Sequence, residues 1–283
     1  MRRKERIFFT FWLILLLLFI HNGETFGQEH FKILLSNDDG IDSPGIVALF
    51  DKLTKIALVT VVAPSKNYSS VGHGITSNDP IMVEKTEKKG TKWYSIGALP
   101  ATCVRLALES LVDEKPDIVV SGINKGENVG VVTYYSGTVA CAREASFKGI
   151  PSVAISLEEG EVMDYAAAAD FMVGLIQEMK EKKLKLGIYL NINFPSLPKY
   201  KIKGVLITKQ DTRPSLEYFE QRKNPRGKIY FWNFYKPLDQ GSEKTDVWAL
   251  RNGYISITPF KFDQTSLSEI ESLVSWKITK WKK

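Results

Sequence analysis

Asn37, Asp38 and Asp39 directly follow an apolar run at residues 32–36 that predicts a buried strand. Neighbouring carboxylates repel each other, and leaving both ionised in a cleft is costly unless a cation compensates them. Their hard oxygen atoms suit Mg²⁺, Mn²⁺ or Ca²⁺. An isolated Asp-Asp-Gly sequence is more typical of a simple turn, so the metal hypothesis depends on which other residues meet the pair.

Two further apolar runs lead into polar loops. The run at 57–63 precedes a loop at 65–74 that is rich in serine and glycine. The hydroxyl and backbone N–H groups of such a loop can supply a metal ligand and phosphate contacts. The run at 117–121 precedes Asn124, a neutral oxygen ligand that suits a pair of aspartates. Its glycines form neither a dinucleotide-binding fingerprint nor a phosphate-binding P-loop.

A fourth polar segment, Ser136-Gly137-Thr138, lies at the start of a helix predicted at 138–148. Backbone N–H groups at a helix start, together with two hydroxyls, make a phosphate site. A serine or threonine that only caps the helix is an equally good explanation of this segment by itself. Only the combination of this segment with the polar strand ends indicates a site for a metal ion and a phosphate.

The elements that must position these residues alternate along the chain. Strands are predicted at 32–36, 57–63, 117–121, 152–156 and 187–193, and helices at 46–56, 101–112, 138–148 and 164–181. Such alternation predicts an α/β fold with a Rossmann-like, doubly wound, mostly parallel sheet. Ligands bind outside the carboxyl ends of the strands in these sheets. The polar segments are therefore expected to converge on one edge.

Composition excludes several classes of protein. Hydrophobic residues make up 44% and charged residues 25%, so wholesale disorder is not expected, and 283 residues fit one large domain with an arm. The net charge is +6, of which residues 1–27 hold +2, far too little clustered charge for nucleic-acid binding. Cys103 and Cys141 form no metal-ligand pattern, and both buried thiols and a disulfide remain open.

The amino terminus has the order of a secretory signal peptide. Basic residues at 2–6 precede an apolar run at 7–20 and a short polar stretch, and cleavage after Gly27 is our hypothesis. The run is shorter than the roughly 20 residues of a spanning helix, although a retained signal anchor is an alternative. We therefore expect export to the periplasm or medium. Membrane association is expected only if the segment is retained.

Several ordered segments resemble the SurE family of metal-dependent survival-protein nucleotidases. They are NDDGIDSPG (37–45), VVAPSKNYSSVGHGIT (61–76), GALPATCVRLAL (97–108), SGINKGENVG (121–130), YSGTVACAREA (135–145), NPRGKIYFW (224–232) and TDVWALRNGYISITPF (245–260). The resemblance covers about residues 32–262. It implies a SurE-like phosphatase domain at 28–283, with the polar and aromatic segment at about 209–245 as an oligomerisation arm in homodimers or homotetramers.

The resemblance also implies a reaction and a set of residues. The reaction is hydrolysis of nucleoside monophosphates, as a 5′-nucleotidase with 3′-nucleotidase and exopolyphosphatase activity as further options. One Mg²⁺ or Mn²⁺ per subunit would be held by Asp38, Asp39, Ser69 and Asn124. We expect catalytic roles for Asp38, which handles a proton or positions water, and for Asn37, which orients substrate or a metal-bound water. The expected substrate or phosphate contacts are Gly72, His73, Asn128, Ser136, Gly137 and Thr138.

The chain departs from the family pattern in two places. Gly74 stands where the family commonly has serine, which removes a hydroxyl beside the site. Residues 1–27 precede the first motif, whereas family members are typically cytoplasmic, and a misassigned start codon is the competing explanation. The rival functions are an exported nucleotide- or phosphate-binding protein without turnover, a receiver domain and a nucleic-acid module. A receiver domain would have about half this length and a further Asp in place of Asn124.

Cleavage after Gly27 predicts a mature chain that begins at Gln28. When the full chain is expressed in a bacterial host, we expect it in the periplasm or medium, with the mass of the shortened form. Cell fractionation followed by mass spectrometry measures both properties. An intact chain in the membrane fraction would support the retained anchor instead, and an intact chain in the cytosol would contradict export.

Overall fold

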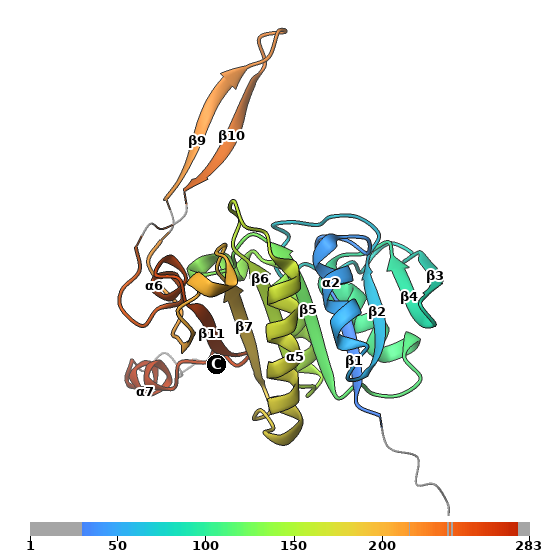
Figure 1. The fold of residues 1–283 in the computed structure, drawn as a ribbon. Coiled ribbons are helices and arrows are strands. Elements are labelled where there is room, and N and C mark those ends of the chain that lie inside the picture. Colours follow the sequence, from blue (N-terminus) through green and yellow to red (C-terminus); the bar gives the residue numbers. More distant parts are fainter. Residues whose placement is uncertain (1–29, 215, 237, 239, 277–283) are drawn as a thin grey trace, which may run out of the picture. The chain divides into compact units, whose positions relative to one another are not determined.

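The sheet is the element that brings the predicted site residues together. The computed structural model describes residues 30–214, 216–236, 238 and 240–276. Within these residues, nine strands form one sheet in the order β3-β4-β2-β1-β5-β6-β7-β11-β8 (Figure 1). The strands are β1 (Lys32–Ser36), β2 (Leu58–Pro64), β3 (Val83–Lys88), β4 (Thr91–Ile96), β5 (Ile118–Lys125), β6 (Ser152–Leu157), β7 (Ile188–Phe194), β8 (Val205–Ile207) and β11 (Ile255–Lys261).

The centre of the sheet is parallel from β4 through β2, β1, β5 and β6 to β7. This confirms the predicted Rossmann-like, mostly parallel α/β fold. Two antiparallel pairings were not predicted: β3 with β4 at one edge, and β11 with β7 toward the other. Every residue of β3 is exposed, so its sequence VEKTEK contains no apolar run that could have marked it as a strand.

Helices cover both faces of the sheet, as a doubly wound fold requires (Figure 1). On one face α2 packs against α5, and on the other α3 packs against α4. Helix α2 buries Ile46, Leu49, Phe50 and Leu53, the apolar positions from which it was predicted. The helices are α2 (Pro44–Leu53), α3 (Pro100–Leu106) with a π-helical turn (Ala107–Leu111), α4 (Gly137–Phe147), α5 (Tyr165–Glu181), α6 (Asp246–Arg251) and α7 (Leu267–Ser275).

Both cysteines lie in the core between the sheet and the α3–α4 layer. Cys103 and Cys141 are free and completely buried within one apolar cluster. Burial raises the pKa of the Cys141 thiol to about 12 and raises the pKa of Cys103 as well. Thiols that resist ionisation in this way are poor nucleophiles and poor metal ligands. The chemistry of the molecule therefore has to come from its oxygen and nitrogen groups.

The predicted arm contains a hairpin of β9 (Leu216–Lys223) and β10 (Ile229–Lys236), paired along eight residues of each strand. It extends away from the sheet (Figure 1). Aromatic side chains are exposed on both of its faces. One face carries Tyr218 and Trp232, and the other carries Phe219 and Phe231.

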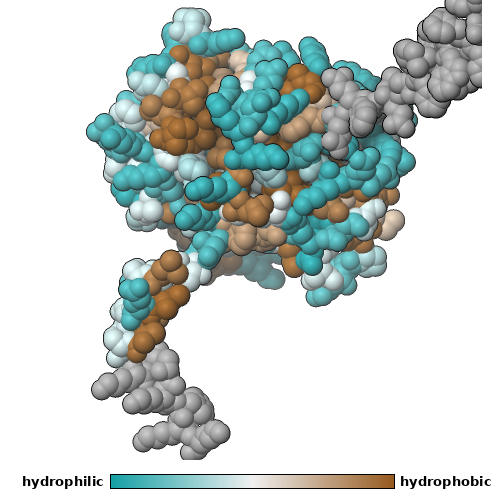
Figure 2. Space-filling model, turned by 90° about the horizontal axis from the view of Figure 1, so that it is seen from below, coloured by the Kyte–Doolittle hydropathy of each residue, from teal (hydrophilic) through white to brown (hydrophobic). Residues whose placement is uncertain are grey.

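The last described helix, α7, has no buried residue. Its apolar residues gather along one side, at the lower left of Figure 2, and include Leu267, Ile270 and Val274. Among the described residues, no helix is long and apolar enough to cross a bilayer. The predicted signal segment at 1–27 lies outside these residues.

Candidate active site

The loop after β1 places Asp38 in the interior at the carboxyl edge of the sheet. Its side chain is buried, and its Oδ1 atom accepts a hydrogen bond from the Thr138 hydroxyl at the start of α4. Its backbone carbonyl accepts the N–H of Tyr68 at 2.8 Å, which ties the loop after β2 to the loop after β1. Burial raises the pKa of Asp38 to about 6, and the negative charge of Asp39 adds to the rise. Hydrogen bonds from Thr138 oppose it.

Asp39 joins the ends of two adjacent strands. Its Oδ2 atom accepts the backbone N–H of Lys125, the last residue of β5, at 3.1 Å. Burial raises the pKa of Asp39, although the Lys125 N–H and ammonium group oppose the rise. Gly40 follows with φ of +104°, a conformation that glycine adopts without steric cost. The two acids are therefore fixed at the edge of the sheet by contacts with different neighbours.

The Asn37 side chain forms hydrogen bonds within its own loop. Its side chain is completely buried, and its amide nitrogen donates to the Gly40 carbonyl at 2.9 Å and to the Ser43 hydroxyl at 2.7 Å. Its Oδ1 atom accepts the Gly40 N–H at 3.2 Å. These bonds close the turn that carries the two aspartates. A contact between Asn37 and substrate stays a prediction.

The loop after β2 brings Ser69 to the same edge. The Ser69 hydroxyl and backbone N–H both donate to Asn67 Oδ1 at 2.7 Å, so the lone pairs of the hydroxyl remain available. The Gly72 N–H donates to the Tyr135 carbonyl at 2.8 Å, which joins this loop to the segment before α4.

His73 lies against α4. Its Nε2 atom is 2.9 Å from Glu144 Oε2, and its ring stacks on Phe147. These contacts give His73 a structural role at the side of α4. Its predicted contact with phosphate stays a prediction.

The end of β5 supplies two asparagines. The β5–β6 ladder shifts register between Ser121 and Asn124, where the Gly122–Ile123 peptide bond is cis. Asn124 donates its amide N–H to the Gly126 carbonyl at 2.6 Å, which leaves Oδ1 as a free acceptor. Asn128 is buried and donates to the Ser156 hydroxyl at 2.8 Å.

The start of α4 packs directly on Asp38. Ser136 caps this helix, because its hydroxyl oxygen accepts the Val139 N–H at 3.1 Å, and its own proton can still be donated elsewhere. Gly137 allows the close approach. A Cβ atom on Gly137 would lie 2.7 Å from Asp38 Cβ and 2.9 Å from Asp38 Oδ2.

One cavity of about 870 Å³ opens at this edge of the sheet. Its lining includes five of the predicted residues: Asp38, Ser69, Asn124, Asn128 and Ser136. Asp39 lines a neighbouring cavity of about 420 Å³, and Lys125 lines both. Four predicted residues (Asn37, Gly72, His73 and Thr138) contact the elements that carry this lining instead.

The sequence did not reveal the far wall of the cavity. This wall is formed by Glu127, Tyr235 and Arg251, from the loop after β5, the end of β10 and the end of α6. Arg251 pairs with Glu127 at 2.6 Å and also with Glu158. No motif marks such a wall, because its residues are far apart in the sequence and become neighbours only in the folded chain.

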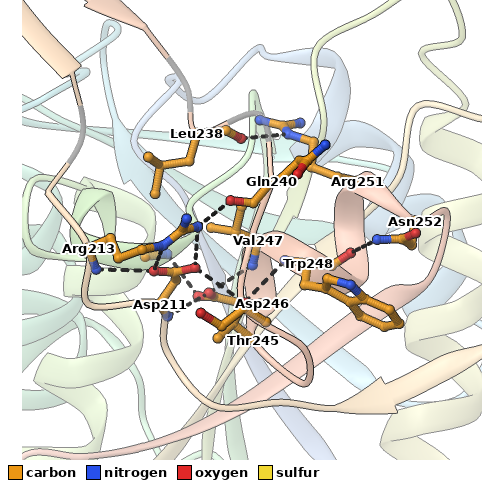
Figure 3. A network of polar contacts seen from close by, with 12 residues as sticks. Asp211, Arg213, Leu238, Gln240, Thr245, Asp246, Val247, Trp248, Arg251 and Asn252 are labelled. Carbon is orange, nitrogen blue, oxygen red and sulfur yellow. Dashed lines mark hydrogen bonds and ion pairs between the residues drawn. The ribbon is translucent and has the colours of Figure 1, made fainter.

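A polar network fixes both ends of the arm beside the cavity (Figure 3). The buried Asp246 carboxylate accepts the backbone N–H of Gly130 at 2.8 Å and of Asp211 at 2.9 Å. The Asp211 carboxylate in turn accepts from Arg213 at 2.8 and 2.9 Å, and Arg213 also binds the Gln240 carbonyl. The segments before β9 and after β10 are thus held against the loop that leads to Ser136.

The oxygen atoms at this edge fit a hard divalent ion. Asp38, Asp39, Ser69 and Asn124 each keep an oxygen with a free lone pair, because their hydrogen-bonding groups are turned to other partners. Two carboxylates with neutral oxygens suit Mg²⁺ or Mn²⁺. Among the described residues, there is no cluster of three or more His, Cys, Asp or Glu residues that could hold a metal, so nitrogen- and sulfur-rich sites are not indicated there.

Comparison with known proteins decides the family. The family model described as "Survival protein SurE" matches residues 33–217. The chain belongs to the SurE family. A relative from Desulforamulus reducens, named "5'-nucleotidase SurE", is 42% identical over 88% of this chain and its own whole length. One of the same name from Natranaerobius thermophilus is 40% identical over 87% of this chain and 98% of its own.

A solved structure agrees with this membership. The crystal structure of the SurE protein from Aquifex aeolicus matches with a TM-score of 0.77 and 36% sequence identity. The match covers 87% of the present chain and 99% of the Aquifex chain. The family resemblance of the ordered motifs and the fold predicted from the alternating pattern are both confirmed.

Replacing Gly137 with alanine should disturb Asp38 specifically. The added methyl group must push the carboxylate or α4 away, which should destabilise the fold by about 1–3 kcal/mol and lower activity roughly 10- to 100-fold. Thermal melts and phosphate-release rates measure the two effects. Gly174→Ala on α5 is the matched control, since its Cβ meets nothing within 4 Å and its activity should stay normal. Full activity in Gly137→Ala would contradict the contact.

Proposed function

We propose that this chain is a metal-dependent phosphohydrolase that removes phosphate from nucleoside monophosphates. The observation that carries the proposal is the cavity of about 870 Å³ at the carboxyl edge, which Asp38, Ser69, Asn124 and Ser136 line. Oxygen ligands and a helix start in one cavity suit a phosphate and its counterion. The names of the relatives, "5'-nucleotidase SurE", support the 5′-nucleotidase assignment. Activity toward 3′-phosphates and polyphosphate is proposed as a further property.

The proposed ligand set is Asp38, Asp39, Ser69 and Asn124. These residues would hold a divalent ion, which would supply positive charge to the phosphate and the attacking water. Thr138 holds Asp38 Oδ1, which leaves Oδ2 to orient the attacking water and accept its proton. The Ser136 hydroxyl, whose oxygen already accepts from Val139, donates its proton to a phosphate oxygen. Asn37 is a positioning residue that holds the turn carrying both acids.

An assay of phosphate release distinguishes an enzyme from a binding protein that does not hydrolyse its ligand. AMP, GMP, 3′-AMP, polyphosphate and p-nitrophenyl phosphate are assayed with Mg²⁺ or Mn²⁺ and with chelator. We expect monophosphate hydrolysis that chelator abolishes. Tight binding of AMP without phosphate release would establish the binding protein instead.

Asp39→Asn should remove most of this activity, by about 10²- to 10³-fold, because one charge of the proposed ligand set is lost while the shape is kept. The fold should remain, as circular dichroism and the melting temperature can verify. Asp42→Asn is the matched control: its carboxylate lies three residues further on and is mostly exposed in an ion pair with Lys88. Near-normal turnover in a well-folded Asp39→Asn protein would refute the ligand assignment.

We propose further that the hairpin is an oligomer contact in a homodimer or homotetramer. Aromatic side chains exposed on both faces of a two-stranded ribbon are typical of a surface that another chain covers. Lysine at one aromatic position of each face should prevent this contact. Phe219→Lys combined with Trp232→Lys should therefore lower the mass in solution to that of one chain.

Light scattering after size exclusion measures this mass. Lys223→Gln on the same hairpin is the control and should leave the wild-type mass unchanged. A wild-type protein that is monomeric at micromolar concentration would contradict the proposal, as would an oligomer that survives both lysines. Export, which rests on residues 1–27, also remains a proposal, and the cleavage experiment above tests it.

A further inference from the structure

The cavity extends beyond the oxygen-rich edge of the sheet to the far wall. Asp38 and Ser136 lie at the edge, whereas Glu127, Tyr235 and Arg251 line the same cavity from the loop after β5, β10 and α6. None of these three belongs to the proposed ligand set. A phosphate at the edge would leave this wall for the rest of the substrate.

Arg251 fixes Glu127 in place. Its guanidinium contacts Glu127 Oε1 at 2.6 Å and also contacts Glu158, while its Nε donates to the Leu238 carbonyl at 3.2 Å. The Glu127 and Arg251 side chains are only 15% and 21% exposed. A carboxylate that is already held by a guanidinium loses little freedom when it binds another donor. Oε2 of Glu127 has no hydrogen-bond partner within the described part of the chain, so it remains an acceptor.

Tyr235 completes the wall with an aromatic ring. Tyr235 and Glu127 line the same cavity, and burial and the Glu127 carboxylate both raise the pKa of the Tyr235 phenol. Val132 and Tyr135, from the segment before Ser136, add apolar and aromatic surface to the same cavity. An aromatic ring is a stacking surface for any nucleobase, and a carboxylate commonly accepts from a ribose hydroxyl.

The network in Figure 3 holds this wall in position. Leu238 and Gln240, just after β10, bind Arg251 and Arg213 respectively, and Asp246 ties the same region to Gly130. The segment that follows β10 is therefore held against the cavity by these hydrogen bonds. The turn between β9 and β10 takes no part in them. A wall positioned before substrate arrives lowers the entropy lost on binding.

We propose that this wall is the nucleoside subsite, in which Glu127 Oε2, positioned by Arg251, accepts a hydrogen bond from the nucleoside and Tyr235 contacts the base. The inference rests on the proposed phosphohydrolase function and adds the residues that select a nucleoside over other phosphate esters.

Glu127→Gln tests the subsite without changing its shape. AMP is compared with p-nitrophenyl phosphate, which has no nucleoside. We expect kcat/KM for AMP to fall about ten-fold, mainly through KM, while p-nitrophenyl phosphate stays within about two-fold of wild type. Glu109→Gln is the control: it removes another 2.6 Å ion pair, with Lys148, at an exposed position and should alter neither substrate.

Two further measurements keep the test decisive. Arg251→Lys keeps the charge but cannot bridge Glu127, Glu158 and Leu238 together, and should show the same AMP-selective loss. Assays with 2′-deoxy-AMP and 2′,3′-dideoxy-AMP identify the donor. If the difference between wild type and Glu127→Gln disappears with either analogue, a ribose hydroxyl binds Glu127, and if it persists with both, a group on the base does so.

Equal losses for AMP and p-nitrophenyl phosphate in the folded Glu127→Gln and Arg251→Lys proteins would overturn the inference, and so would an unchanged kcat/KM for AMP. A wild-type protein that hydrolyses neither ester would instead refute the proposed function. The two failures are therefore distinguishable.

Discussion

The buried carboxylate of Asp38 is the constraint on which this edge of the molecule depends. Burial raises its pKa to about 6, even though Thr138 donates to it and opposes the rise. Asp39 adds a second acid one residue further on. The side chain cannot simply turn to solvent, because Gly137 packs against it and Tyr68 binds its backbone carbonyl. We propose that a dication bound among these oxygens compensates the charge.

Hydrogen bonds between loops make the site a single unit. Asp39 joins the ends of β1 and β5, Tyr68 joins the β2 loop to Asp38, and Gly72 joins that loop to the segment before α4. Each bond links elements that are far apart in the sequence, and the first two join neighbouring strands of the sheet. The Asp246 network adds the two ends of the arm to this unit. The cavity therefore has one edge set by the sheet, where we propose that the metal binds, and a far wall formed by the loop after β5, the end of β10 and the end of α6.

The strands and helices with a regular hydrophobic pattern could be predicted from the sequence. Apolar runs marked the buried parallel strands, and the spacing of Ile46, Leu49, Phe50 and Leu53 marked α2. Strand ends in a parallel sheet share one edge, which was enough to predict that Asp38, Ser69 and Asn124 meet. Strand β3 was missed because all its side chains are exposed. The wall of Glu127, Tyr235 and Arg251 was missed because its contacts span more than 100 residues and follow no periodicity.

A direct measurement of metal binding tests the central claim, that the paired carboxylates persist because a bound dication compensates them. Metal-free protein is titrated with Mn²⁺ while the free ion is followed by electron paramagnetic resonance. The account predicts saturable binding of one Mn²⁺ per chain, displaced by Mg²⁺. A folded protein that binds no Mn²⁺ and still releases phosphate from AMP at the full rate would contradict it.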